Sequence, residues 1–102
     1  MADGEPTPTA PDLLVRDNPT ASRFELVDGD QVIGIAEYQL TDLGVAVMPH
    51  TVIDHSRRGQ GLGDVLIEGA LKDFTARGLR IVPACWFVAD FMQRHPDSAT
   101  AA

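Results

Sequence analysis

The chain has 102 residues, of which 44% are hydrophobic and 23% charged, and its net charge at pH 7 is −7. These values are typical of one small globular domain and exclude a disordered chain. No apolar run approaches the roughly 18 residues that span a bilayer, and an acidic chain lacks the basic face that broad nucleic-acid binding requires. We expect a cytoplasmic protein without a secretory signal, and its single cysteine, Cys85, fits a reducing compartment. We also expect a monomer or weak dimer that binds neither membranes nor nucleic acid.

The first half of the chain predicts an antiparallel meander. Residues 1–11 are rich in proline and threonine and have nothing to bury, which predicts a disordered tail. A short edge strand is expected over 13–15. The segment Asp28-Gly29-Asp30 is a hairpin signal between two apolar strands, the second of which continues to Leu40. A further strand is expected over 45–53, and connections this short exclude parallel crossovers.

The second half of the chain changes to helical periodicity. Apolar residues recur at spacings of three and four over 61–77, which predicts an amphipathic helix ended by a glycine. Residues 79–82 predict a short buried strand, parallel to the preceding strand because a helix connects the two. A final helix is expected over 86–95. The fold class is therefore α+β (α/β mixed), with a mostly antiparallel sheet and two helices, in a domain spanning 12–98 that a flexible C-terminus at 99–102 follows.

The most informative segment is the glycine-rich loop 58–63 (RGQGLG), between a strand and the long helix. Glycines let the backbone approach an anion closely, and the start of a helix offers unpaired N–H groups with a partial positive charge. Arg57 and Arg58 can add charge-assisted hydrogen bonds at the rim of this loop. The loop therefore predicts a site for a pyrophosphate or a similar anion, and the alternative is a solvated pair of arginines.

Three kinds of phosphate-binding loop can be compared with this segment. A dinucleotide-binding loop has the spacing GxGxxG after the first strand of a parallel unit, and a Walker loop continues to GK[ST]; neither pattern occurs here. The loop does match the pattern [Q/R]xxGx[G/A] of the GNAT acetyltransferases, through Arg58, Gly61 and Gly63. Roughly residues 14–97 resemble a subfamily of small single-domain GNAT-like acetyl-CoA-binding proteins, with further matches at Phe24-Glu25-Leu26, Tyr38, His50-Thr51, Pro83-Ala84-Cys85, Phe87-Val88 and His95-Pro96.

This resemblance implies a GNAT-like N-acetyltransferase domain whose sheet splays at one parallel strand pair, with the pantetheine of acetyl-CoA between the two strands. The chain departs from the subfamily at Val52, where an acidic residue is frequent, and at Ser98, where an aromatic residue is frequent. It also lacks the early helical segment that walls the acceptor site in full-size enzymes, so an open or partner-completed acceptor site is expected. The cofactor, acetyl-CoA or CoA, is expected to contact Ile53, Arg57, Arg58, Gly59, Gln60, Gly61, Leu62 and Gly63.

Two residues are candidates for catalysis. Cys85 directly precedes the final helix, a position at which a thiol can become nucleophilic, and the resemblance implies an acetyl acceptor there. The alternative is a small buried apolar residue. His50 lies on the strand expected to face the thioester and is the candidate general base or cysteine partner; the alternative is a structural histidine. The three histidines and the cysteine lack metal-ligand spacing, so we expect no metal site.

Two functions remain open at this stage. The first is an N-acetyltransferase that passes the acetyl group of acetyl-CoA to an unknown amine or protein acceptor, directly or through an acetyl-Cys85 intermediate. The second is a non-catalytic acetyl-CoA-binding module that acts as a sensor or through a partner. Cys85 and His50 favour the enzyme, whereas the missing acceptor wall favours the binding module. The acidic chain favours a cationic amine or a basic peptide as acceptor.

Overall fold

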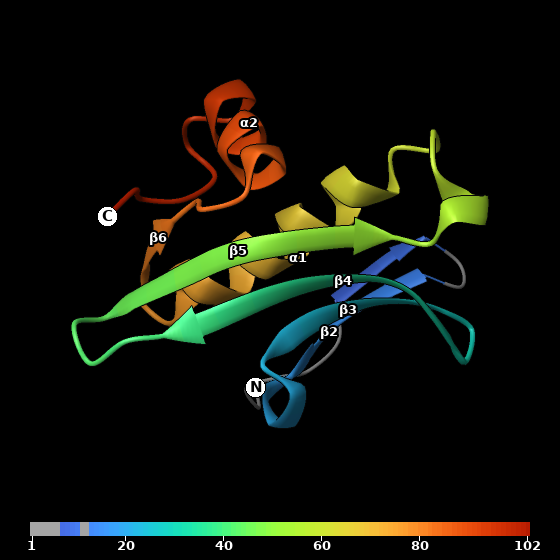
Figure 1. The fold of residues 1–102 in the computed structure, drawn as a ribbon, viewed down its shortest axis with the longest axis horizontal. Coiled ribbons are helices and arrows are strands. Elements are labelled where there is room, and N and C mark those ends of the chain that lie inside the picture. The colour runs from blue at the N-terminus through green and yellow to red at the C-terminus, as the bar shows by residue number, and fades with distance from the viewer. Residues whose placement is uncertain (1–6, 11–12) are drawn as a thin grey trace.

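The computed structural model describes residues 7–10 and 13–102, and its centre is a six-stranded mixed sheet accompanied by two α-helices (Figure 1). The strands lie in the sheet in the order of the sequence, and each neighbouring pair is antiparallel except β5 and β6. The predicted α+β fold class, with a mostly antiparallel sheet and one parallel pair, is confirmed. The elements are β1 (Thr7–Ala10), β2 (Leu13–Asn18), β3 (Arg23–Asp28), β4 (Gln31–Leu40), β5 (Val45–Ile53), α1 (Leu62–Ala76), β6 (Arg80–Val82) and α2 (Trp86–Arg94), with 3₁₀ turns at Pro19–Ala21 and His55–Arg57.

Helix α1 covers one face of the sheet, behind it in Figure 1, and contacts β2 to β5. Its apolar positions recur at helical spacing, so Leu66, Ala70 and Phe74 face the core and are fully buried. The ring of Phe74 packs edge-on against Phe24 of β3 and Tyr38 of β4, with ring centroids 5.1 and 5.2 Å away. These contacts fix α1 across the strands. None of the described helices is long and apolar enough to cross a membrane.

A polar cluster fixes the C-terminal end of α1. Tyr38 donates its O–H to Asp17 Oδ1 at 2.6 Å, and Arg77, just after α1, donates from Nη2 to Asp17 Oδ2 at 2.6 Å. Arg77 Nε also donates to Asp73 Oδ1 at 2.7 Å. Burial and the hydrogen bond to Asp17 raise the pKa of Tyr38 well above its ordinary value, so the phenol remains a donor at neutral pH. The cluster therefore joins β2, β4 and α1 at the end of the helix opposite the glycine loop.

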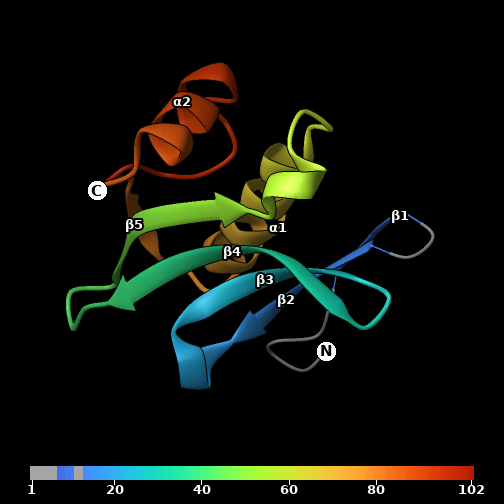
Figure 2. The ribbon, with the colours of Figure 1, turned by 45° about the vertical axis from the view of Figure 1, so that its right-hand side comes forward.

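Strands β5 and β6 pair over only three residue pairs, from Val45 with Arg80 to Val47 with Val82. Beyond this point β5 continues to Ile53, whereas the chain after β6 turns away into α2 (Figure 2). Along its second half, β5 therefore has β4 on one side and no described strand on the other. The two parallel strands separate in the way that the resemblance implied.

A β-bulge in β5 lies directly after the last pair with β6. The register of β4 and β5 shifts between Glu37 and Gln39, where Met48 and Pro49 of β5 oppose a single residue of β4. A bulge bends a strand and increases its twist, and Pro49 has no N–H to offer a neighbouring strand. The bulge thus directs the second half of β5 away from β6.

The two ends of the chain differ from the sequence-based expectation where the structure describes them. Most of the predicted N-terminal tail lies outside the described residues, but Thr7–Ala10 forms β1 and pairs with β2, which is therefore not an edge strand. Residues 99–102, expected to be flexible, follow the outer edge of β6: Ile81 donates its N–H to the carbonyl of Thr100 and accepts one from Ala102, both at 2.8 Å. Pairing of this kind satisfies the backbone groups of an edge strand and does not depend on side-chain pattern.

Candidate functional site

A cleft of about 600 Å³ opens where β5 and β6 separate. Three segments form it: the second half of β5, the glycine loop with the first turn of α1, and the first turn of α2. Every residue predicted to contact the cofactor except Gln60 is among its lining residues. The cleft is lined by His50, Thr51, Val52, Ile53, Arg57, Arg58, Gly59, Gly61, Leu62, Gly63, Asp64, Trp86 and Phe87.

The loop before α1 has a conformation that requires glycine. Gly59 and Gly61 have φ values of 80° and 73°, in the left-handed region that residues other than glycine rarely adopt. Gly61 is also the N-cap of α1, and no side chain among the described residues caps the start of this helix. The backbone N–H groups of residues 62–64 therefore have no partner in the part of the chain that the structure describes. These donors and the positive end of the helix dipole form a cradle for an anion, hereafter the α1 cradle (backbone N–H groups of 62–64).

The two neighbouring arginines have different partners. Arg57 forms an ion pair with Asp28 of the β3–β4 hairpin, with Nη2 and Oδ2 separated by 2.8 Å. Arg58 donates from Nε to the backbone carbonyl of Ile53 at 3.3 Å and makes no ion pair with any described residue. Arg58 is therefore the arginine of the pair whose charge is available to an anion in the cleft.

The first turn of α2 gives the cleft an aromatic wall. Trp86 is 78% exposed, and its ring lies edge-on to that of Phe87 with the centroids 5.8 Å apart. Phe87 in turn lies against Gly63, where an added Cβ atom would come within 2.5 Å of the phenyl ring. Glycine at this position therefore allows close contact between α1 and α2. Phe87 is partly buried against the core and also lines the cleft.

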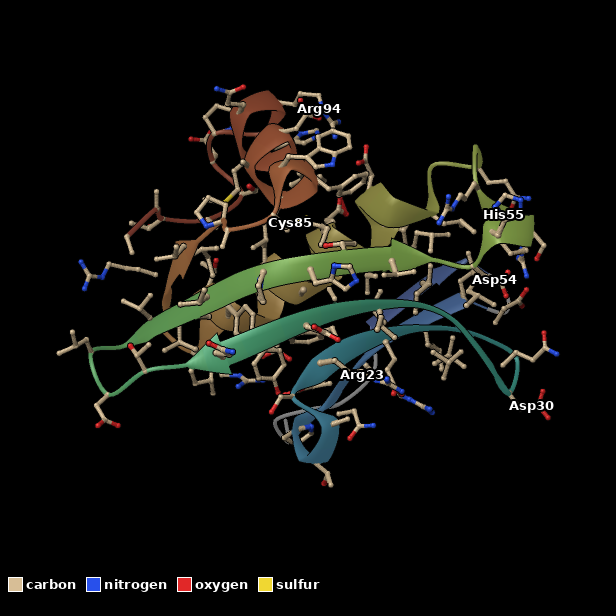
Figure 3. All side chains as sticks on the ribbon, in the orientation of Figure 1. Arg23, Asp30, Asp54, His55, Cys85 and Arg94 are labelled. Carbon is tan, nitrogen blue, oxygen red and sulfur yellow. The ribbon has the colours of Figure 1, made fainter. Side chains whose placement is uncertain are left out.

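Cys85 and His50, the predicted catalytic residues, lie on different elements. Cys85 is the N-cap of α2 (Figure 3), and its free thiol is half-buried against the core rather than among the residues that line the cleft. His50 is exposed on β5 and lines the cleft. Neither side chain forms a hydrogen bond with another residue in 13–102, so the imidazole and the thiol are not paired in this structure.

Thr51 provides an independent indication of a ligand. Its hydroxyl Oγ1 is buried and has no hydrogen-bond partner among the described residues. Burying an unpaired hydroxyl costs free energy, and such groups in native proteins almost always have a partner. Thr51 lies on the part of β5 that pairs with β4 on one side and has no described strand on the other, and it lines the cleft. A ligand with amide groups that runs along this edge would complete the hydrogen bonding of the hydroxyl and of the strand.

Comparison with known proteins identifies the family. A family model described as GCN5-related N-acetyl-transferase matches residues 23–101, which is most of the chain. The chain belongs to this family. Among solved structures, the ribosomal-protein-S18-alanine N-acetyltransferase from Escherichia coli is similar to this GNAT-family protein, with a TM-score of 0.58 and 20% identity, covering 87% of this chain and 54% of that one. The likeness shows a shared fold, and the chain spans about half the length of that enzyme. No curated protein matches the sequence.

Five residues that line the cleft of this GNAT-family protein were not predicted as site residues. Trp86 and Phe87 occur at helical spacing with other apolar residues, a pattern that indicates a core as readily as a ligand site. Asp64 is an acidic residue in the first turn of a helix, which is common and gives no indication of a site. Thr51 and Val52 follow the predicted His50 directly on β5. They line the cleft because β5 continues past the end of β6, which the sequence alone does not show. The five are Thr51, Val52, Asp64, Trp86 and Phe87.

A second hollow of about 620 Å³ lies between α1 and the segment that follows α2. Its lining mixes acidic and basic side chains, and it includes neither the start of a helix nor the open edge of β5. The hollow does contain a residue with a buried, unpaired hydroxyl, Ser98, but the start of a helix and the open edge of a strand both occur at the first cleft and not at this hollow. The hollow is lined by Glu68, Lys72, Thr75, Phe91, Arg94, His95, Pro96, Asp97 and Ser98.

Proposed function

We propose that this GNAT-family protein binds acetyl-CoA in the cleft at the splayed strands and transfers its acetyl group to an amine acceptor. One observation carries the proposal: the uncapped start of α1 and the open edge of β5 line the same cleft. A pyrophosphate needs several converging donors, and a pantetheine arm with amide groups needs an extended backbone beside it. The buried, unpaired hydroxyl of Thr51 supports the same ligand. Acetyl-CoA supplies the acetyl group as a thioester.

Each part of the cleft has its own role in this proposal. The α1 cradle and Arg58 hold the pyrophosphate, and charge-assisted hydrogen bonds contribute roughly 1.5–3 kcal/mol each, so a few are enough for micromolar affinity. The open edge of β5 over residues 48–53 pairs with the pantetheine. Trp86 and Phe87 exclude water from the opposite side of the cleft.

The transfer itself needs a nucleophile and a group that takes up a proton. In the direct route, the amine nitrogen attacks the thioester carbonyl, the carbon–sulfur bond breaks, and the sulfur leaves as a thiolate that becomes protonated. His50 is exposed in the cleft and is the candidate base that removes the proton from the amine. In the alternative route, Cys85 attacks the thioester first and the amine then attacks acetyl-Cys85. The absence of a hydrogen bond between His50 and Cys85 favours the direct route.

A non-catalytic acetyl-CoA-binding module is the second candidate function. The observation that favours it is the separation of the two predicted catalytic residues, because an unpaired thiol has no neighbouring base to activate it. Both functions use the same cleft and the same ligand, and they differ only in turnover. For either function, a cytoplasmic location and a monomeric or weakly dimeric state complete the proposal.

Mass spectrometry of the purified protein with acetyl-CoA separates these functions. Under native conditions we expect one bound acetyl-CoA per chain. With a panel of primary amines and basic peptides we expect time-dependent release of free CoA and an acetylated amine, slowed in the variant His50→Ala. Under denaturing conditions the direct route leaves the protein mass unchanged, whereas the Cys85 route adds one acetyl group that Cys85→Ala abolishes.

The outcomes of this experiment test different parts of the proposal. A complex that releases no CoA with any amine contradicts the enzyme and supports the binding module. If no complex forms at millimolar acetyl-CoA with a folded protein, both functions are wrong. Unchanged release of CoA in the His50→Ala variant would show that His50 is not the base, and would not affect the assignment of the cleft as the acetyl-CoA site.

A further inference from the structure

Asp64 is a carboxylate placed beside the α1 cradle. It is the third residue of α1, and it lines the cleft together with the glycine loop. A carboxylate at the third helical position can fold back to an unpaired N–H at the start of its own helix, which is the geometry of a capping box. Folded back in this way, Asp64 would accept the N–H of Gly61, the N-cap residue beside the cradle, and would repel an incoming pyrophosphate.

In the structure, Arg94 holds this carboxylate instead. Arg94 lies in the last turn of α2 (Figure 3) and binds Asp64 with both terminal nitrogens, Nη1 to Oδ2 at 3.0 Å and Nη2 to Oδ1 at 2.9 Å. Its Nε donates to Asp90 Oδ2 at 2.9 Å, and its guanidinium lies over the ring of Phe91, 5.6 Å from the centroid. The guanidinium is therefore fixed from three sides. With both oxygens bonded to Arg94, the carboxylate of Asp64 does not cap α1.

We propose that Arg94 is a positioning residue that keeps the carboxylate of Asp64 out of the α1 cradle and balances its charge, so that the cradle stays open for the pyrophosphate of acetyl-CoA. The ligand named here rests on the proposed function. Both oxygens of Asp64 are occupied by one planar guanidinium, a bidentate geometry that lysine cannot reproduce. The hydrogen bond from Arg94 also holds the pKa of Asp64 below its ordinary value, so the pair persists to lower pH than an isolated aspartate would remain charged.

The structure distinguishes this role from two simpler ones. An ion pair between side chains that are each 42% exposed contributes little to stability, so a purely structural role predicts a small loss of stability and no change in affinity. A direct contact between Arg94 and a phosphate predicts a loss of affinity that does not depend on Asp64. The proposed role predicts a loss of affinity that removal of the Asp64 charge reverses.

A set of four variants tests the proposal, with CoA as the probe in titration calorimetry. We expect Arg94→Gln to weaken CoA binding about tenfold, and the double variant Arg94→Gln with Asp64→Asn to return within about threefold of the original affinity. The single variant Asp64→Asn should bind CoA at least as tightly as the unchanged protein. The matched control is Asp90→Asn, which removes the other carboxylate partner of Arg94 and should leave CoA affinity unchanged. Equal weakening in the single Arg94→Gln variant and in the double variant would overturn the proposal.

A second measurement needs no ligand. We expect Arg94→Gln to slow amide hydrogen exchange at residues 61–64, because the freed carboxylate then accepts a hydrogen bond at the start of α1. Unchanged or faster exchange at these amides would overturn the fold-back of Asp64. The exchange measurement is independent of the proposed function. A protein that binds no CoA would contradict the proposed function, and the exchange data would still show whether Arg94 controls the position of Asp64.

Discussion

Replacing Gly61 with aspartate is expected to weaken acetyl-CoA binding at least about 100-fold while the protein remains folded. Gly61 has a φ of 73°, a region that aspartate and asparagine tolerate better than other side chains, and no atom lies within 4 Å of an added Cβ. The substitution would place a carboxylate at the α1 cradle, where a pyrophosphate is proposed to bind. Two like charges a few ångströms apart at a protein surface repel by several kcal/mol, and about 2.7 kcal/mol already corresponds to 100-fold.

The control for this prediction is Gly61→Asn. Asparagine has the shape of aspartate without the charge, so it carries the same backbone strain and occupies the same space. We expect Gly61→Asn to lose no more than about fivefold in affinity, measured by calorimetry on variants with matched circular dichroism spectra. Equal losses in the two variants would show that charge at this loop is irrelevant to binding, and affinities of both variants equal to that of the unchanged protein would remove the loop from the site.

Replacing Phe74 with alanine is expected to lower the free energy of unfolding by about 3–5 kcal/mol. Phe74 is fully buried, contacts the rings of Phe24 and Tyr38, and has the Arg77 guanidinium 5.4 Å from its ring centroid. Truncation leaves a cavity at the point where α1 rests on β3 and β4, and it removes two edge-on aromatic contacts. A loss of this size is a large fraction of the 5–15 kcal/mol that stabilises a typical domain.

Urea denaturation measures this effect, and Phe74→Leu is the matched control. Leucine fills much of the same volume but makes no aromatic contact, so we expect it to cost about 1–2 kcal/mol. A Phe74→Ala variant that loses less than about 1 kcal/mol would contradict the described packing of α1 on the sheet.

Most of the fold could be predicted from the sequence because several local signals agree with it. The Asp28-Gly29-Asp30 signal corresponds to a tight hairpin in which Asp28 pairs with Gln31 and Gly29 has a φ of 62°. The predicted helix over 61–77 is α1, which ends before Gly78, also in the left-handed region. Each of these features depends on one backbone conformation or one apolar period, and both are local properties of the sequence.

The parts that could not be predicted depend on backbone hydrogen bonds between distant segments. The pairing of Ile81 with Thr100 and Ala102 involves no side-chain pattern, and the small residues of the C-terminus give no apolar period. The bulge at Met48 and Pro49 likewise follows from how β4 and β5 align. Strand pairing of this kind is decided by which segments reach an open edge.

The candidate site divides in the same way. The glycine loop was predictable because a left-handed backbone before a helix has a strong residue preference, and Gly59 and Gly61 have that conformation. The different roles of Arg57 and Arg58 were not predictable, because Asp28, which pairs with Arg57, lies on a distant hairpin. The relation of Arg94 to the loop is similarly a contact between two helices that only the folded chain brings together.

An NMR titration of ¹⁵N-labelled protein with CoA tests the central claim, that acetyl-CoA binds between the start of α1 and the open edge of β5. We predict saturable shifts of the amides of Gly59, Gly61 and residues 62–64, of the amides along residues 50–53, and of the indole N–H of Trp86. The amides beside the second hollow, such as those of Lys72 and Asp97, should remain unchanged. Shifts confined to the second hollow, or no shifts in the glycine loop at saturating CoA, would contradict the assignment of this cleft as the acetyl-CoA site.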